Sequence, residues 1–191
     1  MRAVRAAQAS APVARPVRRR DREINREAVL DLLERGEYGV LALDDGSSWP
    51  YAVPLSYVLS DGVLYFHCAQ SGRKIGIMAR NNRVCFTVVA DVEPVYAGSF
   101  STYYGCALVI GRVFPVGDRE EKKQALLLLA KKYFPEHTDK ADEYAERSFE
   151  STAVYRIVPE LLSGKAKNRP ESGKSGSPRS VGAEKAAGSP A

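Results

Sequence analysis

The spacing of apolar residues predicts one helix near the start of the chain, followed by a run of strands. Asn25 is placed to cap this helix, and Gly36 to end it, because glycine accepts the left-handed conformation that often follows a last turn. The apolar stripe, at helical spacing, consists of Ala28, Val29, Leu32 and Leu33. Further helices are predicted at residues 71–81, 118–133 and 140–147. Asp118 and Glu121 resemble a capping box at the second of these.

Six segments have the short apolar runs and turn punctuation that are typical of strands. They cover residues 38–43, 51–59, 63–69, 83–90, 104–116 and 152–158. Residues 60–62 predict a hairpin between the second and third strands, and a loop is predicted around Glu93–Pro94. Pro54 predicts an edge or a bulge, because proline cannot donate to a strand ladder. Short strands with few helices favour a mainly β, α+β barrel or sandwich, and closure of a barrel removes exposed edges.

The net charge of +5 comes from the two ends of the chain. Residues 1–20 contain six arginines and no acid, and residues 165–191 contain six basic residues against two glutamates, so residues 21–164 carry a net charge of −5. A basic face on the domain is the usual mark of nucleic-acid binding, so no specific nucleic-acid partner is expected. No stretch approaches the roughly 20 apolar residues of a membrane span, so no membrane partner is expected either.

Composition predicts one domain flanked by two tails. The domain covers residues 18–167, between a disordered basic extension at residues 1–17 and a disordered tail at residues 168–191 that is rich in Gly, Ser, Pro and Lys. The arginine-rich start also fits a transit peptide, but it lacks the apolar stretch of a secretory signal.

The three cysteines, Cys68, Cys85 and Cys106, lie in strand-like runs without CxxC spacing. This is typical of buried free thiols in a reducing compartment and predicts a cytoplasmic protein. The two histidines, His67 and His137, do not combine with the cysteines at the spacing of a zinc site, so no metal is expected.

The segment from His67 to Lys74 is the most suited to chemistry, because it lies where a strand ends and a helix begins. Alternate side chains of a strand share a face, so His67 and Ala69 leave room for a flat ligand beside an imidazole. Gly72 permits a close backbone approach or a positive φ, and Arg73 and Lys74 follow in the first helical turn. Free N–H groups and two cations suit a phosphate. The same residues also fit a solvated turn and a structural histidine. One predicted face of this strand carries Tyr65, His67 and Ala69, and the opposite face carries Leu64, Phe66 and Cys68.

A second candidate stretch runs from Pro50 to Tyr57. It is predicted to pair with residues 63–69 through the hairpin turn. Backbone groups freed near Pro54, with Ser56 and Tyr57, are placed to meet the polar edge of an aromatic ring system. The alternative interpretation is a hairpin with a bulged strand.

These two stretches, in this order and close together, resemble the flavin-binding core of the nitroimidazole-reductase-like branch of the pyridoxamine-phosphate-oxidase superfamily. The pattern is PY-x-VP-L-x-Y, then Y-x-H-x-A-x-x-G-x-K, then a strand that opens V-C-F. The matching residues are Pro50, Tyr51, Val53, Pro54, Leu55, Tyr57, Tyr65, His67, Ala69, Gly72, Lys74, Val84, Cys85 and Phe86. The resemblance covers residues 18–167.

The resemblance implies a six-stranded antiparallel split β-barrel, a homodimer, and FMN bound at the subunit interface. Lys74, with the backbone after Gly72, would hold the phosphate, and His67 would lie near the reactive face of the isoalloxazine. Arg73 and Ala69 are also predicted to contact the cofactor. The residues implied to line the isoalloxazine are Val53, Pro54, Leu55, Ser56 and Tyr57. Relatives often have serine at the position of Cys106, which is included among the predicted cofactor contacts.

The resemblance also implies an FMN-dependent oxidoreductase that reduces a small aromatic or nitro-type compound. His67 is the predicted catalytic residue, because a histidine near its ordinary pKa can position a substrate or transfer a proton. Four alternatives remain: a pyridoxamine-phosphate-oxidase-like enzyme, a deazaflavin-dependent reductase, a non-catalytic flavin- or haem-binding protein, and an interaction domain without a cofactor. The first needs a second basic cluster that the sequence does not offer. For a haem protein, His67 would be the candidate ligand.

Overall fold

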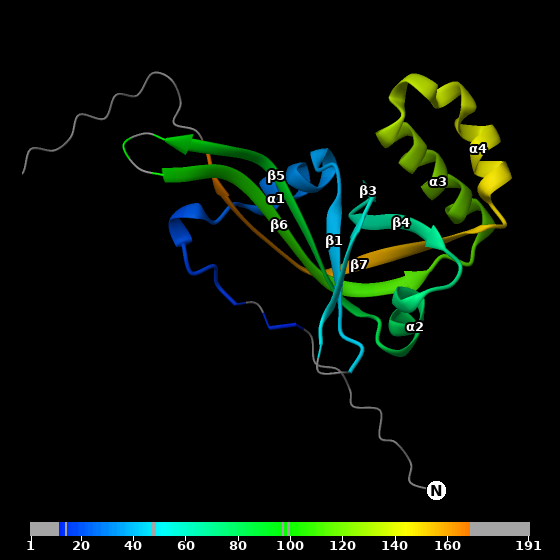
Figure 1. Cartoon of the computed structure of the whole chain (residues 1–191), viewed down its shortest axis with the longest axis horizontal. Helices are drawn as coiled ribbons and strands as arrows, with labels where there is room; N and C mark the ends of the chain where they lie inside the picture. The colour runs from blue at the N-terminus through cyan, green and yellow to red at the C-terminus, as the bar shows by residue number, and fades with distance from the viewer. Residues whose placement is uncertain (1–11, 14, 47–48, 97, 99, 169–191) are drawn as a thin grey trace, which may run out of the picture.

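The computed structural model describes residues 12–13, 15–46, 49–96, 98 and 100–168, so most of both predicted tails lies outside the described residues. Within this range the chain is mainly β, with one antiparallel sheet and four α-helices (Figure 1). The strands are β1 (Gly39–Leu43), β2 (Tyr51–Leu55), β3 (Val58–Ser60), β4 (Val63–Ala69), β5 (Arg83–Tyr96), β6 (Phe100–Pro115) and β7 (Thr152–Lys167). The α-helices are α1 (Arg26–Arg35), α2 (Arg73–Arg80), α3 (Arg119–Tyr133) and α4 (Ala141–Ser148).

The sheet curls into a split barrel because its two ends are consecutive in the sequence. The strand order is β2-β1-β5-β6-β7-β4-β3, and only Ser56 and Tyr57 join β2 to β3. The sheet therefore bends until its ends meet, yet β2 and β3 do not pair, so the barrel stays open. This confirms the mainly β split-barrel prediction. The described residues contain seven strands rather than six, because the predicted strand at residues 51–59 divides at Ser56–Tyr57.

The division also changes the predicted pairing of this segment. β3 pairs with β4 across the predicted hairpin, with Val58 opposite Tyr65. β2 instead pairs with β1, with Pro54 opposite Val40, so the prediction that this half pairs with residues 63–69 is wrong. β2 is an edge strand of the described sheet, which confirms the prediction made from Pro54, since a proline at an edge interrupts no second ladder.

β5 and β6 form a hairpin arm that is longer than predicted. The register shifts between Ala90 and Glu93, where Asp91 has a φ of 57°, and the ladder then resumes as far as Tyr96 and Phe100. The loop predicted at Glu93–Pro94 is therefore wrong, because a bulge lets both residues rejoin the strand. β7 likewise continues to Lys167 rather than ending at Val158, again past a register shift.

The main core fills the inside of the curled sheet and is closed by α1 and α2. Its fully buried side chains include Leu33, Leu41, Tyr57, Leu64, Phe66, Ile77, Phe86, Val88, Val109 and Ile157. Asn25 caps α1 as predicted, because its side chain accepts a hydrogen bond from the Ala28 N–H at 2.9 Å. Gly36 ends α1, but its φ of −62° is not the predicted left-handed conformation. Glycine is required there because a Cβ would lie 2.3 Å from the side chain of Val88.

α3 and α4 pack as a hairpin beyond β4 and β7, outside the barrel (Figure 1). Their own small core consists of Val116, Ala125, Leu126, Ala145, Phe149 and Val154. Asp118 caps α3 as predicted and accepts a hydrogen bond from the Glu121 N–H at 2.8 Å. The Glu121 carboxylate accepts hydrogen bonds from Arg156 at 2.6 Å and from the Tyr65 hydroxyl at 3.1 Å. Glu121 therefore ties α3 to β7 and β4 instead of closing a reciprocal capping box.

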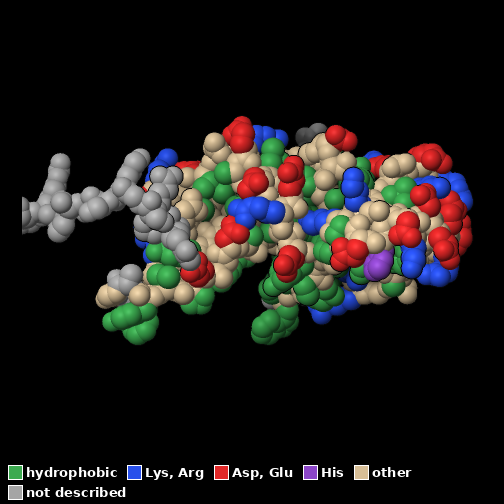
Figure 2. Space-filling view, turned by 90° about the horizontal axis from the view of Figure 1, so that it is seen from above, with side chains coloured by type: hydrophobic (Ala, Val, Ile, Leu, Met, Phe, Trp, Pro, Cys, Tyr) green, Lys and Arg blue, Asp and Glu red, His purple; other side chains and the backbone are tan. Residues whose placement is uncertain are grey.

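The two ends of the molecule differ in surface chemistry (Figure 2). Acidic and basic side chains are interspersed over the α3–α4 end, where Lys123 pairs with Glu146 at 2.9 Å. Apolar side chains gather at the tip of the β5–β6 arm. Tyr96 and Phe100 are 71% and 93% exposed there, with ring centroids 5.1 Å apart. Exposed paired aromatic rings at the end of an arm are typical of a surface that contacts another molecule.

Candidate functional site

The strand β4 presents two different faces, as its sequence predicts. Leu64 and Phe66 are fully buried in the main core, and Cys68 packs against the same cluster. Tyr65 and His67 point to the opposite side, toward the α3–α4 hairpin. β4 therefore separates the barrel interior from a second space in which His67 is exposed to a ligand.

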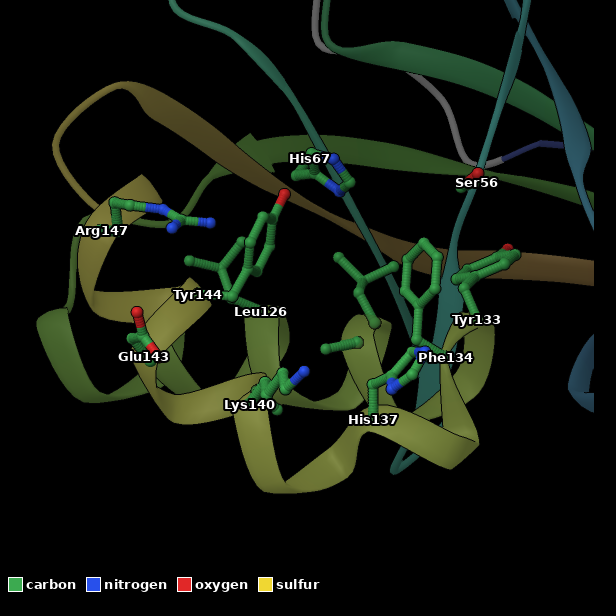
Figure 3. A pocket seen from close by; sticks show the side chains of 13 residues that line it. Ser56, His67, Leu126, Tyr133, Phe134, His137, Lys140, Glu143, Tyr144 and Arg147 are labelled. Carbon is green, nitrogen blue, oxygen red and sulfur yellow. The ribbon is translucent and has the colours of Figure 1, made fainter.

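This second space is a pocket of about 620 Å³ between β4 and the α3–α4 hairpin, which we call the helical pocket (Figure 3). Its apolar wall comes from α3, and its mouth carries polar and aromatic side chains. The lining residues are Ser56, His67, Leu126, Leu129, Ala130, Tyr133, Phe134, His137, Lys140, Ala141, Glu143, Tyr144 and Arg147. A volume of this size suits a small organic molecule, and predominantly apolar walls with a few polar groups are typical of such sites.

His67 forms the inner polar end of the helical pocket. Its Nδ1 is buried and has no hydrogen-bond partner among the described residues. Burial also lowers the pKa of His67 below its ordinary value of 6.5, so the imidazole is neutral at pH 7. In Figure 3 the hydroxyl end of Tyr144 points toward His67, and the ring of Phe134 lies below it. A neutral imidazole that lines a pocket can hydrogen-bond a ligand or exchange a proton with it.

Tyr133, in the last turn of α3, holds the junction between β2 and β3. Its hydroxyl accepts a hydrogen bond from the Tyr57 N–H at 2.8 Å and lies within donor distance of the carbonyls of Tyr57, at 2.9 Å, and Glu37, at 2.7 Å. The Tyr57 ring turns inward, where its hydroxyl donates to the Leu33 carbonyl at 2.7 Å. Both the side chain and the backbone of Tyr57 are therefore engaged within the protein.

Beyond this junction, the facing edges of β2 and of the second half of β4 have no strand partner among the described residues, and we call this break in the barrel the split. On one side β4 pairs with β7 along Leu64–Ala69, but on the other side β3 covers only Val63–Tyr65. β2 pairs with β1 alone among the described strands. Continued by two residues, the β3–β4 register would set Ser56 opposite His67, in agreement with their shared place in the helical pocket. Strand edges without a partner offer backbone N–H and C=O groups to the polar rim of a flat ligand.

The start of α2 lies directly after β4. Gly72 is the N-cap residue and has a φ of 132°, which confirms the predicted positive φ, and no side chain caps the helix there. Arg73 contacts Asp45 at 3.3 Å and lies over the ring of Tyr51 at 4.6 Å. Lys74 is close enough to Cys68 for its positive charge to oppose the rise in the pKa of this thiol that burial causes. The uncapped N–H groups and the two cations form an anion-binding corner at the α2 end of β4.

The outer face of β1, β2, β5 and β6 is apolar along most of its length, and the paired Arg83 and Arg112 follow at its end. In the registers of these strands its outward residues are Val40, Ala42, Ala52, Pro54, Cys85, Thr87, Val89, Cys106, Leu108 and Ile110. Val89, for example, is 52% exposed, whereas its neighbour Val88 is buried. Burial raises the pKa of the Cys106 thiol, so it is neutral at pH 7. We call these ten residues the outer sheet face.

Most of the predicted site residues fall into three groups in the structure. Ser56 and His67 meet in the helical pocket, Gly72, Arg73 and Lys74 form the anion-binding corner, and Cys106 lies with Pro54 on the outer sheet face. Val53 and Leu55 pack against the main core, so their side chains face away from a ligand in the split. Ala69, exposed at the end of β4, lies between the pocket and the corner.

Sequence reasoning missed the contribution of the α3–α4 hairpin. Tyr133, Phe134, Tyr144 and Arg147 all line the helical pocket. One signal was available, since residues 125–130 form an apolar run wider than one buried helix face requires. Within the described part of the chain, no group of three or more His, Cys, Asp or Glu residues is placed to hold a metal ion. No described helix is long and apolar enough to cross a membrane.

An open split barrel with a helical pocket at its split defines the class of fold to which the chain belongs. The sequence profile of the pyridoxamine 5'-phosphate oxidase family matches residues 25–166, and the chain belongs to that family. This confirms the superfamily suggested by the sequence motifs. No curated protein sequence matches the chain.

Solved structures share the fold. The flavocytochrome Anf3 from Azotobacter vinelandii is 19% identical, with a TM-score of 0.71 over 81% of this chain and 73% of that one. A candidate 5-nitroimidazole antibiotic resistance protein from Bacteroides thetaiotaomicron is 24% identical, with a TM-score of 0.65 over 75% and 86%. The FAD and heme binding protein from Mycobacterium smegmatis is 20% identical, with a TM-score of 0.65 over 76% and 72%.

Proposed function

We propose that the protein is an oxidoreductase that binds FMN along the split, with the phosphate in the anion-binding corner. The observation that carries this proposal is the start of α2, where Gly72 turns the chain at a positive φ and leaves the helix uncapped. Lys74 supplies the main charge, because Arg73 is already shared with Asp45. One corner with one largely available cation suits a single phosphate group.

The split suits the ring system of a flavin. The unpaired backbone edges of β2 and of Phe66–Ala69 lie between the anion-binding corner and the pair Ser56 and His67. A flavin lying along it would place its polar rim against these backbone groups. Among the proteins of the same fold, Anf3 is a flavocytochrome and the Mycobacterium smegmatis protein binds FAD and haem, which supports a flavin here.

Bound flavin would supply the electron transfer, while the protein supplies orientation and exclusion of water. The helical pocket opens beside the split, so a small aromatic or nitro-type electron acceptor would lie against its apolar wall. His67 would position this acceptor and exchange a proton with it through the part of the imidazole that lines the pocket. Because the imidazole is neutral at pH 7, it acts as a hydrogen-bonding group rather than as a cation.

The absorption spectrum of the purified protein, with mass analysis of any released chromophore, tests the cofactor. Flavin bands and released FMN are expected. Lys74→Ala should weaken FMN binding about 10- to 100-fold, the loss expected for one charged hydrogen bond, whereas Lys131→Ala, at an exposed position of α3, should leave it unchanged. A Soret band would indicate bound haem instead of flavin, with His67 as the candidate haem ligand. A protein that stays colourless after incubation with FMN would refute the flavin proposal.

Turnover with a nitroaromatic acceptor and a chemical reductant tests the role of His67. His67→Gln should keep the flavin spectrum and reduce the rate, because it removes a group that exchanges protons. Full turnover by this variant would show that His67 does not contribute to catalysis.

We also propose that two copies pair through the outer sheet face. Ten outward side chains without a charge, on four adjacent strands, form a surface that water solvates poorly. The exposed aromatic pair of Tyr96 and Phe100 extends it along the arm. Light scattering should give a dimer mass, and Val89→Glu should give a monomer. Thr138→Glu, at an exposed position between α3 and α4 and outside the sheet, should leave the dimer intact. A monomeric wild-type protein would refute the pairing.

A further inference from the structure

The helical pocket has a wall that fits an aromatic ring. Leu126, Leu129 and Ala130 of α3 face Ala141 of α4 across it. At the mouth, Phe134 and Tyr144 are 61% and 42% exposed, although both are large aromatic side chains. Aromatic side chains that border an apolar pocket favour a flat ligand, which they can stack on or meet edge to face.

The charges at the mouth favour an anion. Lys140 and Arg147 line the pocket together with His137, against one acid, Glu143. No described residue forms an ion pair or a side-chain hydrogen bond with Lys140 or Arg147.

The other acids of α4 are turned away from the pocket. Asp142 and Glu146 both lie within ion-pair distance of Lys123 on α3, at 3.8 Å and 2.9 Å. Glu146 also lies 3.9 Å from Arg119. The cations on the pocket side therefore keep their charge available for a ligand.

The two ends of the pocket have different chemistry. Figure 3 shows Arg147 extending from α4 toward Tyr144, and Lys140 reaching into the pocket from the mouth. His67 and Ser56 lie at the inner end, on the strand side. A ligand that fills the pocket would meet Lys140 at the mouth, an apolar middle, a neutral imidazole at the inner end, and Arg147 to one side, near Tyr144.

We propose that the helical pocket binds a flat aromatic carboxylate. Its carboxylate lies at Arg147, its ring lies against the α3 leucines, and His67 borders it on the strand side. That such a compound is the electron acceptor rests on the proposed function, but its binding does not. Arg147 is the main specificity residue, because a guanidinium can bind both oxygens of a carboxylate.

Calorimetric titration of the full-length protein with 4-nitrobenzoate and with its uncharged isostere 4-nitrobenzamide tests this proposal. The carboxylate should bind at least about tenfold more tightly than the amide. Arg147→Gln should remove most of this preference by weakening carboxylate binding far more than amide binding, whereas Arg26→Gln, at the start of α1, should preserve it. Glu143→Gln should strengthen carboxylate binding a few fold, an effect that loss of folding cannot produce.

Equal affinity for the two compounds, or a preference that survives Arg147→Gln, would overturn the proposal. The cofactor question is answered separately by the spectrum. A colourless protein that prefers the carboxylate would support the aromatic-anion site and refute the flavin proposal. A yellow protein without the preference would support the flavin proposal and refute the aromatic-anion site.

Discussion

The side chain of Lys132 offers a sharp test of the electrostatics around the split. Its Nζ is buried without a hydrogen-bond partner among the described residues and lies 4.0 Å from the centroid of the Tyr57 ring. Burial lowers the pKa of Lys132 from its ordinary value of 10.5 to about 8. At about 1.36 kcal/mol for each pH unit, this corresponds to about 3.4 kcal/mol of unfavourable free energy for the charged form at pH 7.

Two effects reduce this penalty. The side chain is only half-buried, so solvent screening lowers the unfavourable free energy of the charged form to about 1.5 kcal/mol. The contact of the cation with the aromatic ring offsets about 0.5 kcal/mol of this. Lys132→Met keeps the packing of the stem against Tyr57 and removes the charge. We therefore expect Lys132→Met to raise the free energy of unfolding at pH 7 by about 1 kcal/mol.

The pH dependence gives the decisive readout. Because the pKa of Lys132 is lower in the folded protein, the unfolded chain binds more protons between pH 8 and 10.5, and the stability of the wild type gains from rising pH in that window. The advantage of Lys132→Met, measured by urea denaturation, should therefore shrink from pH 7 to pH 10. Lys131→Met, at the exposed neighbouring position, should show no such trend. A variant destabilised equally at both pH values would refute the reasoning.

Three further predictions, two of them with a matched control variant, test the local structure by denaturant unfolding. Tyr133→Phe should cost about 1–3 kcal/mol, because the Tyr57 N–H loses its acceptor; an unchanged midpoint would show that water replaces the hydroxyl. Gly36→Ala should cost about 1–3 kcal/mol, since the Cβ meets a β5 side chain at 2.3 Å. Gly76→Ala, where the new Cβ meets only the end of an arginine at 3.5 Å, should instead be neutral or stabilising by about 0.5–1 kcal/mol, and equal effects at the two glycines would contradict the packing argument. Asn25→Ala should cost about 0.5–2 kcal/mol through loss of the cap, whereas Asn25→Asp should retain most of the stability.

Local signals in the sequence predicted much of the fold. Apolar periodicity and caps placed α1 and α3, because Asn25 and Asp118 act on N–H groups three residues away. The motif at residues 67–74 predicted both the faces of β4 and the positive φ of Gly72. These features depend on neighbours in the chain, which the sequence displays directly.

Features that depend on distant partners were not predictable. Gly36 was assigned to a left-handed turn, whereas its actual constraint is the side chain of Val88 on β5. No turn signal in the sequence marks the division of residues 51–59, which is held instead by hydrogen bonds between the backbone of Tyr57 and the hydroxyl of Tyr133 on α3. The helical pocket likewise needs β4 and the α3–α4 hairpin together, so neither segment alone indicates it.

The strand order also has a consequence for the course of folding. The β5–β6 hairpin forms between neighbours in the chain, but β4 must pair with β7, where Leu64 meets Ile157 after α3 and α4 have been made. Contacts between distant segments form slowly, because the intervening chain must first lose entropy. During synthesis, β4 therefore lacks its β7 partner until the last strand has been made, and the apolar side chains of Leu64 and Phe66 are not yet enclosed. We expect barrel closure to be the folding step most prone to aggregation.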